Sequence, residues 1–354
     1  MRIPRVDFDT AKIDALLVAS LPNVQYLTGF DGSHALVLIE KSGEVTLFTD
    51  PRYTIHAGRV FKGKVVTVKN KSSLAQDALK LAIKRKHKRI GFERLHVTYA
   101  EYQTISENLP LGVELKPAGG DIEKQRMVKD GHELNAIRKA VDINSDAFDA
   151  ATKKVRHGMT ETDLAAEIDY QQRRRGASGN AFDTIVAFGE KTALPHAHPG
   201  SVKLAKDDII LIDVGARQDG YTSDMTRMLS IGKIGTRLKQ LYKAVLESQL
   251  AAIDAIREGV PANRVDQAAR SVLKTHGLDQ YFVHSTGHGL GLEIHEAPSL
   301  RKKDKTPLAA GMVITVEPGV YVEGVGGIRI EDTVLVTKGG FEILTPTRKE
   351  LIQL

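Results

Sequence analysis

Residues 208–232 read DIILIDVGARQDGYTSDMTRMLSIG, two apolar runs on either side of a short polar stretch. The pattern predicts a β-hairpin whose turn is centred on Gln218-Asp219. Residues equally far from such a turn face each other across antiparallel strands, so Asp213 and Asp224 are predicted to lie side by side. The run LIDV is typical of a buried strand, where two unpaired carboxylates are costly. We therefore expect a positive charge between them.

A second hairpin pattern occupies residues 312–337, MVITVEPGVYVEGVGGIRIEDTVLVT. Glu317 and Glu331 are equally far from Gly324 and should also face each other. Pairing with Arg or Lys explains one carboxylate on an apolar strand, but it explains a symmetrical set of four poorly. Two divalent cations would neutralise four carboxylates, and one neutral imidazole would complete a five-ligand cage. Oxygen-rich ligation with one nitrogen favours Mn²⁺, and Co²⁺, Zn²⁺ or Fe²⁺ also fit.

The imidazole should come from residues 284–296, HSTGHGLGLEIHE, which hold three histidines among glycines. The stretch is not an HExxH motif, because Pro298 follows His295-Glu296 and would break the helix that this motif needs. Its glycine spacing also differs from that of a dinucleotide-binding fingerprint. These residues alone do not tell which of the three histidines is a ligand.

The bulk composition sets limits on the function. The chain has 354 residues and no cysteine, which excludes disulfides, thiolate metal sites and cysteine nucleophiles. It shows neither an apolar run long enough for a membrane helix nor a secretory signal, so we expect a cytoplasmic protein without a membrane partner. The formal net charge is +6, and the densest basic run is KRKHKR at residues 84–89. We interpret this run as a solvated helix end rather than a phosphate-binding patch, and expect no nucleic-acid partner.

The chain should form two domains. Residues 1–122 alternate short apolar strands with helical segments, which predicts a compact α/β module. A stretch with Pro117, Gly119 and Gly120 interrupts the pattern, and a long amphipathic helix follows it. We place the domain boundary near residue 122.

The second domain carries an internal repeat. Gly158 and Gly176 are 18 positions apart, and so are Gly259 and Gly277. The first segment contains a capping box, formed by Thr160 and Asp163. An H-x-x-P sequence follows in each half, at residues 196–199 and 295–298. The preserved order predicts two halves related by a pseudo-two-fold axis.

These motifs together resemble a known family. The order Asp213, Asp224, His288, Glu317, Glu331 is similar to the ligand set of the pita-bread metallopeptidases, the family of methionine aminopeptidase, aminopeptidase P and prolidase. Their contexts IDVGA, YTSDMTR, HSTGHGLGLEIHEAP, TVEPGVY and GGIRIEDTVLVT resemble the Xaa-Pro subgroup, as do TALPHAHPG and IEKQRMVKDGHELNAIRKA. GFDGS and TDPRYT resemble the creatinase/prolidase-type N-terminal domain.

The resemblance implies an α+β fold, with a pita-bread catalytic domain over residues 123–354 and a smaller α/β N-terminal domain over residues 1–122. Methionine aminopeptidases usually lack this N-terminal domain and the arginine of IRIED. Creatinases share the fold but lack the metal ligands, all five of which are present here. The family also implies a homodimer.

The family's roles can be transferred to matching positions. Asp213 would chelate one metal, His288 and Glu317 the other, and Asp224 and Glu331 would bridge the pair. Glu317 would also shuttle the proton of the attacking water.

The remaining roles concern the substrate. His295 would steady the oxyanion, and His196 would flank the leaving group. His284 would line the proline subsite, and Arg329 would support the site beside Glu331. No family role matches His198, which we interpret as structural or exposed.

The implied activity is hydrolysis of the peptide bond before proline, with Xaa-Pro dipeptidase as the first expectation. Aminopeptidase P, which acts on longer Xaa-Pro peptides, is the alternative. A dipeptidase needs a basic group for the free prolyl carboxylate. Some prolidases have an arginine where this chain has Ser299, so Arg301 and Arg52 are the candidates here. A non-enzymatic binding protein on the same fold is the competing class, and the complete ligand set disfavours it.

Overall fold

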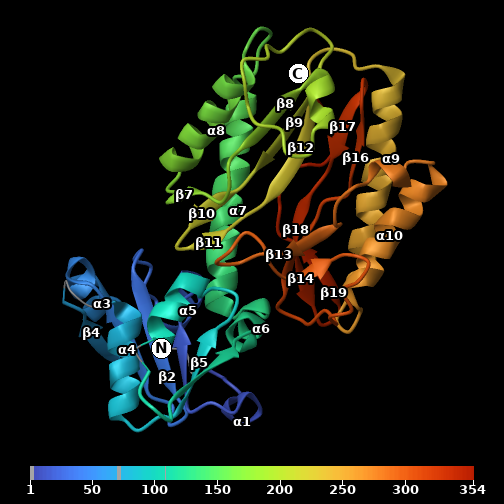
Figure 1. Ribbon diagram of the computed structural model, residues 1–354. Helices are drawn as coiled ribbons and strands as arrows, with labels where there is room; N and C mark the ends of the chain where they lie inside the picture. Colours follow the sequence, from blue (N-terminus) through green and yellow to red (C-terminus); the bar gives the residue numbers. More distant parts are fainter. Residues whose placement is uncertain (1–3, 70–72, 108) are drawn as a thin grey trace. The chain divides into compact units, whose positions relative to one another are not determined.

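The computed structural model describes residues 4–69, 73–107 and 109–354 (Figure 1). The chain folds into two compact units, Met1–Arg126 and Met127–Leu354.

The N-terminal unit is built around a mixed six-stranded sheet of order β4-β3-β2-β1-β5-β6. Its strands are β1 (Ala15–Val18), β2 (Ala35–Glu40), β3 (Val45–Thr49), β4 (Lys64–Thr67), β5 (Arg89–Glu93) and β6 (Glu114–Ala118). The helices are α1 (Phe8–Ala11), α2 (Leu21–Thr28), the 3₁₀ turn η1 (Pro51–Tyr53), α3 (Thr54–Val60), α4 (Leu74–Lys84), α5 (Tyr99–Ser106) and α6 (Asp121–Met127).

Both faces of this sheet are covered. Successive side chains of a strand point to opposite faces, and in β1 Leu16 packs into the same apolar cluster as Val24 of α2, while Leu17 packs into the cluster of Ala78 of α4. The continuous apolar run of β1 follows from burial on both sides. The basic run after α4 is engaged at the surface, where Arg85 pairs with Glu44 at 2.6 Å.

The C-terminal unit consists of two similar halves. The first has helices α7 (Gly131–Thr152) and α8 (Glu161–Arg174), the 3₁₀ turn η2 (Gly189–Ala193) and strands β7 (Gly179–Asn180), β8 (Ile185–Phe188), β9 (Ile209–Val214), β10 (Ala216–Gln218), β11 (Tyr221–Thr222) and β12 (Met225–Ser230). The second has α9 (Thr236–Asp254), α10 (Ala262–Thr275), η3 (Asp279–Tyr281), β13 (Gly287–Gly289), β14 (Glu296–Leu300), β15 (Val313–Val316), β16 (Gly319–Val322), β17 (Gly326–Arg329), β18 (Asp332–Thr337) and β19 (Gly340–Ile343), followed by β20 (Ile352–Gln353).

The strands form sheets of order β20-β12-β9-β8 and β14-β13-β15-β18-β19, with the smaller sheets β11-β10-β7 and β16-β17. Helices α7 and α8 flank the strands on one side, and α9 and α10 flank them on the other (Figure 1). Among the helices that the structure describes, none is both long and apolar enough to cross a membrane.

Equivalent backbone hydrogen bonds occur in the two halves. The amide of Gly158 donates to the carbonyl of Leu204 at 2.8 Å, and that of Gly259 donates to Leu308 at 2.7 Å. All four glycines of the repeat have positive φ, which favours glycine. The predicted capping box of Thr160 and Asp163 is present at the start of α8. The repeat expected from the sequence is therefore a structural repeat.

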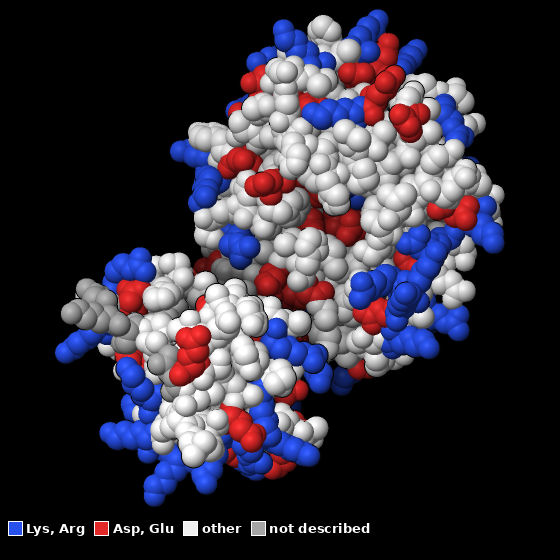
Figure 2. Space-filling model, in the orientation of Figure 1, with Lys and Arg blue, Asp and Glu red and all other residues white. Residues whose placement is uncertain are grey.

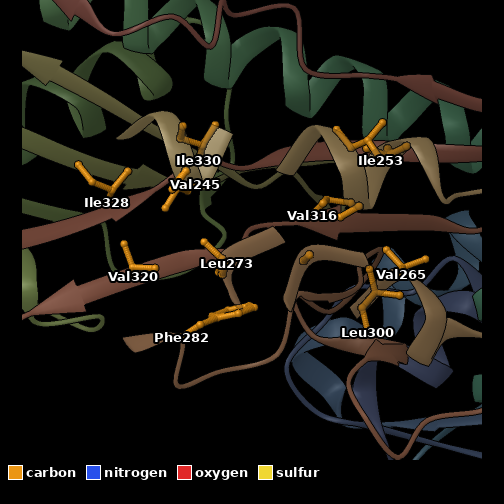
Figure 3. Close-up of a cluster of buried hydrophobic side chains, with 14 of the residues drawn as sticks. Val245, Ile253, Val265, Leu273, Phe282, Leu300, Val316, Val320, Ile328 and Ile330 are labelled. Carbon is orange, nitrogen blue, oxygen red and sulfur yellow. The ribbon is translucent and has the colours of Figure 1, made fainter. Parts of the chain in front are cut away.

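The largest apolar cluster anchors the strands of the second half (Figure 3). It joins Val245 of α9 and Leu273 of α10 to Val316 and Ile330, all fully buried. Burying such a side chain contributes about 1.5–3 kcal/mol. Val316 and Ile330 directly precede Glu317 and Glu331 in the sequence, so this packing fixes the backbone from which both carboxylates project.

Candidate metal centre

The first predicted hairpin forms, but its register differs from the prediction by two residues. Asp213 pairs with Thr226 rather than with Asp224. The turn lies over Asp219-Gly220, where both residues have positive φ, as a tight two-residue hairpin turn of the Asp-Gly type requires. Because the shift is two residues, Asp224 keeps the same face and lies diagonally beside Asp213.

The second hairpin has the predicted register. Val316 pairs with Asp332, and Gly319 pairs with Arg329. Both pairs are symmetrical about Gly324, as are Glu317 and Glu331, which stand between them along the strands.

The acidic side chains converge. One ligand atom each from Asp224, His288 and Glu331 lie within 4.8 Å of one another. These three residues, together with Asp213 and Glu317, line a cavity of about 620 Å³. Figure 2 shows acidic side chains recessed in the face of the C-terminal unit.

Hydrogen bonds fix the orientation of these carboxylates. Arg329 Nη2 donates to Asp213 Oδ2 at 2.6 Å, and Arg329 Nε donates to Thr226 Oγ1 at 3.0 Å. Thr226 Oγ1 in turn donates to Glu331 Oε2 at 2.8 Å. His288 Nε2 lies 3.3 Å from Glu317 Oε1 and 3.6 Å from Asp224 Oδ2.

The electrostatics of the cluster call for added positive charge. Burial, with repulsion from Glu331 and Asp213, raises the pKa of Asp224 well above its usual range. Burial, with repulsion from Glu317 and Asp213, does the same to the pKa of Glu331. Burial also raises the pKa of Asp213, although Arg329 opposes it. One guanidinium does not neutralise three buried carboxylates and the half-buried Glu317.

Two buried oxygens support the fit of a cation. Asp213 Oδ1 and Glu331 Oε1 are buried, and neither has a hydrogen-bond partner among the described residues. A buried charged oxygen without a partner is rare and costly. The donor set of carboxylate oxygens and one imidazole nitrogen suits a divalent ion such as Mn²⁺.

The other three predicted site histidines lie at the same cavity. His196, His284 and His295 all line it, and the ring of His295 lies 4.4 Å from that of His288. Burial lowers the pKa of both His284 and His295, which favours the neutral imidazole. His198, for which we expected no role, also lines the cavity.

The two candidate carboxylate-binding arginines belong to different units. Arg301 is exposed and is not among the residues that line the cavity. Arg52 belongs to the N-terminal unit, where its guanidinium donates to Asp50 at 2.7 Å. Ser299, at the position where some prolidases have arginine, does line the cavity.

Three residues of the site were not found from the sequence. Thr226 links Arg329 to Glu331, and the Tyr321 hydroxyl accepts from Arg329 Nη1 at 2.7 Å and lies 2.9 Å from His284 Nε2. Asp183 is exposed and lines the cavity. Thr226 and Tyr321 could have been suspected, because β-strand alternation places Thr226 on the face of Asp224, and Tyr321 on that of Arg329.

Comparisons with known proteins agree with this architecture. The sequence profile described as metallopeptidase family M24 matches residues 135–338, and that of the creatinase/prolidase N-terminal domain matches residues 5–128. The Xaa-Pro dipeptidase of Pyrococcus furiosus is 35% identical over 344 residues, which cover 97% of each chain.

Solved structures are similarly close over their whole length. An Xaa-Pro dipeptidase from Bacillus anthracis has a TM-score of 0.94 at 36% identity, covering 98% of this chain and 97% of the other. An X-Pro aminopeptidase from Thermotoga maritima has a TM-score of 0.90 at 35% identity, covering 98% and 99%. The fold and the site thus define a metal-dependent peptidase. The chain belongs to metallopeptidase family M24 and carries the family's creatinase/prolidase-type N-terminal domain, as expected from its motifs.

Proposed function

We propose that this protein is a dinuclear-metal hydrolase that cleaves the peptide bond before proline, with Xaa-Pro dipeptides as its first substrates. The observation that carries the proposal is the convergence of four carboxylates and His288 on one cavity, in a chain that matches Xaa-Pro dipeptidases from end to end.

The proposed ligands divide between two cations. Asp213 would hold one ion, His288 and Glu317 the other, and Asp224 and Glu331 would bridge them. Mn²⁺ is the proposed ion, with Co²⁺, Zn²⁺ or Fe²⁺ as alternatives. When bound, the cations would polarise the scissile carbonyl and lower the pKa of a water molecule. Arg329 would hold Asp213 in place through its 2.6 Å bond.

The proton transfers fall to this chain's own side chains. Glu317 would take a proton from the attacking water, so that a C–O bond forms as the water's oxygen adds to the carbonyl carbon. His295 would donate a hydrogen bond to the developing oxyanion. Glu317 would then return the proton to the prolyl nitrogen as the C–N bond breaks. His196 would flank this leaving group, and His284 would line the proline subsite.

A second candidate is an aminopeptidase that acts on longer Xaa-Pro peptides. A free prolyl carboxylate needs a cationic partner, and Arg329 is the only lysine or arginine among the described residues that line the cavity. Its guanidinium already donates hydrogen bonds to Asp213 and to the Tyr321 hydroxyl. A dipeptidase would need a cationic side chain that is not among these lining residues, and Arg52 and Arg301 remain the candidates.

One experiment separates the two. Protein loaded with Mn²⁺ and protein stripped with chelator are each given Ala-Pro and Arg-Pro-Pro, and products are identified by mass spectrometry. Metal-dependent cleavage of Ala-Pro supports the dipeptidase. Cleavage mainly of Arg-Pro-Pro supports the aminopeptidase. Cleavage of neither, with Mn²⁺, Co²⁺, Zn²⁺ or Fe²⁺, would contradict the proposal and favour a binding protein. The expectations of a homodimer and of a cytoplasmic location stay predictions.

A further inference from the structure

Residues 282–286 connect helix α10 and the turn η3 to strand β13, beside the cavity. In this segment, His284 lines the cavity and lies 2.9 Å from the Tyr321 hydroxyl. The Thr286 carbonyl accepts a hydrogen bond from the amide of Glu317 at 2.8 Å. The position of this segment therefore affects both a cavity histidine and a proposed metal ligand.

Arg270, on helix α10, donates hydrogen bonds to two backbone carbonyls of this segment. Its Nη1 donates to the Phe282 carbonyl at 3.1 Å, and its Nη2 donates to the His284 carbonyl at 2.5 Å. The guanidinium also lies 4.2 Å from the centre of the Phe282 ring. A planar guanidinium can serve several acceptors at fixed angles, and the ammonium of a lysine cannot reproduce this fork.

Asp266, one turn earlier on α10, completes the clamp. Its side chain is 1% exposed, and its Oδ2 accepts from Arg270 Nε at 2.9 Å. Its Oδ1 accepts from the Thr286 hydroxyl at 2.8 Å. The carboxylate thus orients the guanidinium and also binds the end of the segment next to β13.

We propose that Arg270 is a positioning residue that sets the place of His284 in the substrate cavity. Arg270 does not itself line this cavity, so it acts through the two backbone carbonyls it binds. The proposal rests on the proposed function, in which His284 contacts the prolyl part of the substrate. Loss of the clamp should weaken substrate binding more than it slows the chemical step.

The outer face of the clamp is open to solution. Arg270 and Asp266 line a separate hollow of about 390 Å³, together with Asn263, Gln267, Ser271, Lys274, Asp279 and Lys302. The Arg270 side chain is 20% exposed. When the side chain is truncated, a free guanidinium ion can therefore reach the vacated position from this hollow.

The test compares Arg270→Ala and Arg270→Lys with Arg264→Ala. Arg264 is on the same helix, is exposed, and donates to Gln267 Oε1 at 2.7 Å, so it is a matched control. A misplaced contact of about 1 Å can cost about 100-fold in rate. We expect kcat/KM for the better of Ala-Pro and Arg-Pro-Pro to fall about 10–100-fold in both Arg270 variants, mainly through KM. The control should match the unsubstituted protein.

Chemical rescue and a spectroscopic signal test positioning itself. Millimolar guanidinium should lower the raised KM of Arg270→Ala, while sodium chloride at equal ionic strength should not. The ¹⁵N signal of the His284 ring, assigned by its loss in His284→Gln, should shift in both Arg270 variants and stay unchanged in Arg264→Ala. This signal requires no substrate, so it distinguishes failure of this proposal from failure of the proposed function.

An unchanged KM in a folded Arg270→Lys, an unshifted His284 signal, or a lack of rescue in a folded Arg270→Ala would each overturn the proposal. If Arg270→Ala does not fold, the KM and the His284 signal of Arg270→Lys decide it.

Discussion

Thr226→Val removes one hydroxyl from the middle of the candidate metal centre and nearly preserves the shape of the side chain. Thr226 is fully buried, donates to Glu331 Oε2 at 2.8 Å and accepts from Arg329 Nε at 3.0 Å. The variant therefore leaves a buried carboxylate and a buried guanidinium each without one partner.

The size of the effect follows from these two bonds. A hydrogen bond to a charged group contributes about 1.5–3 kcal/mol, and about 1.4 kcal/mol is a factor of ten in an equilibrium constant. Loss of the donor disfavours the ionised, cation-binding form of Glu331 and frees its carboxylate to rotate. We expect the affinity for Mn²⁺ to fall about 10–100-fold, as is usual when a group that orients a metal ligand is removed.

The assay is calorimetric titration of Mn²⁺ into chelator-treated protein. Thr222→Val is the matched control, because the Thr222 hydroxyl is equally buried but donates to the backbone carbonyl of Gly291 at 3.0 Å rather than to a carboxylate. Its affinity for Mn²⁺ should be unchanged. Unchanged affinity in a folded Thr226→Val, or an equal loss in Thr222→Val, would refute the reasoning.

Three further predictions concern the carboxylates of the site and the cavity that they line. Because burial and repulsion raise the pKa of Asp224 and Glu331, these two groups bind protons more tightly in the folded metal-free protein than in the unfolded chain, so their contribution to stability should be lost as pH rises from about 4 through the raised pKa values. Chemical denaturation of this protein and of Glu331→Gln across pH checks this, and a difference in stability between the two that stays constant over that window would contradict it. Mn²⁺ should displace these protons and raise the melting temperature, since a ligand at 100 times its Kd adds about 2.7 kcal/mol to the free energy of unfolding. Calorimetric titration in buffers of different ionisation enthalpy measures the proton release, and a binding heat that does not depend on the buffer would contradict it. Asp183→Asn should raise KM for Arg-Pro-Pro several-fold at low salt and leave kcat unchanged, because an exposed carboxylate in the cavity attracts cationic peptides. Equal KM values for the variant and the unsubstituted protein would exclude that role.

Alternation of apolar residues predicted the hairpins of the candidate metal centre, because strand period and burial are local properties of the chain. The second register followed from the symmetry about Gly324. The register of the first hairpin differs from the prediction because its tight turn requires two residues with positive φ, and Asp219-Gly220 supply them. The predicted side of the sheet survived, since a two-residue shift preserves the face.

Tertiary contacts account for what the sequence could not predict. Arg270 and Phe282 are 12 positions apart and look like ordinary helix and loop residues until their contact is seen. The sequence assigned a role to His196 and none to His198, yet both line the cavity. In the N-terminal unit, Pro117 was predicted to interrupt the strand pattern, but it lies within β6, whose ELKPA sequence has only one large apolar residue, Leu115, to indicate a strand.

The most direct test of the account is a titration of metal-free protein with Mn²⁺, in which bound metal per chain and cleavage of Ala-Pro and Arg-Pro-Pro are measured on the same samples. We predict that cleavage reaches its plateau when two ions are bound per chain. Full cleavage with one ion bound, or by chelated protein without metal, would contradict the two-metal centre.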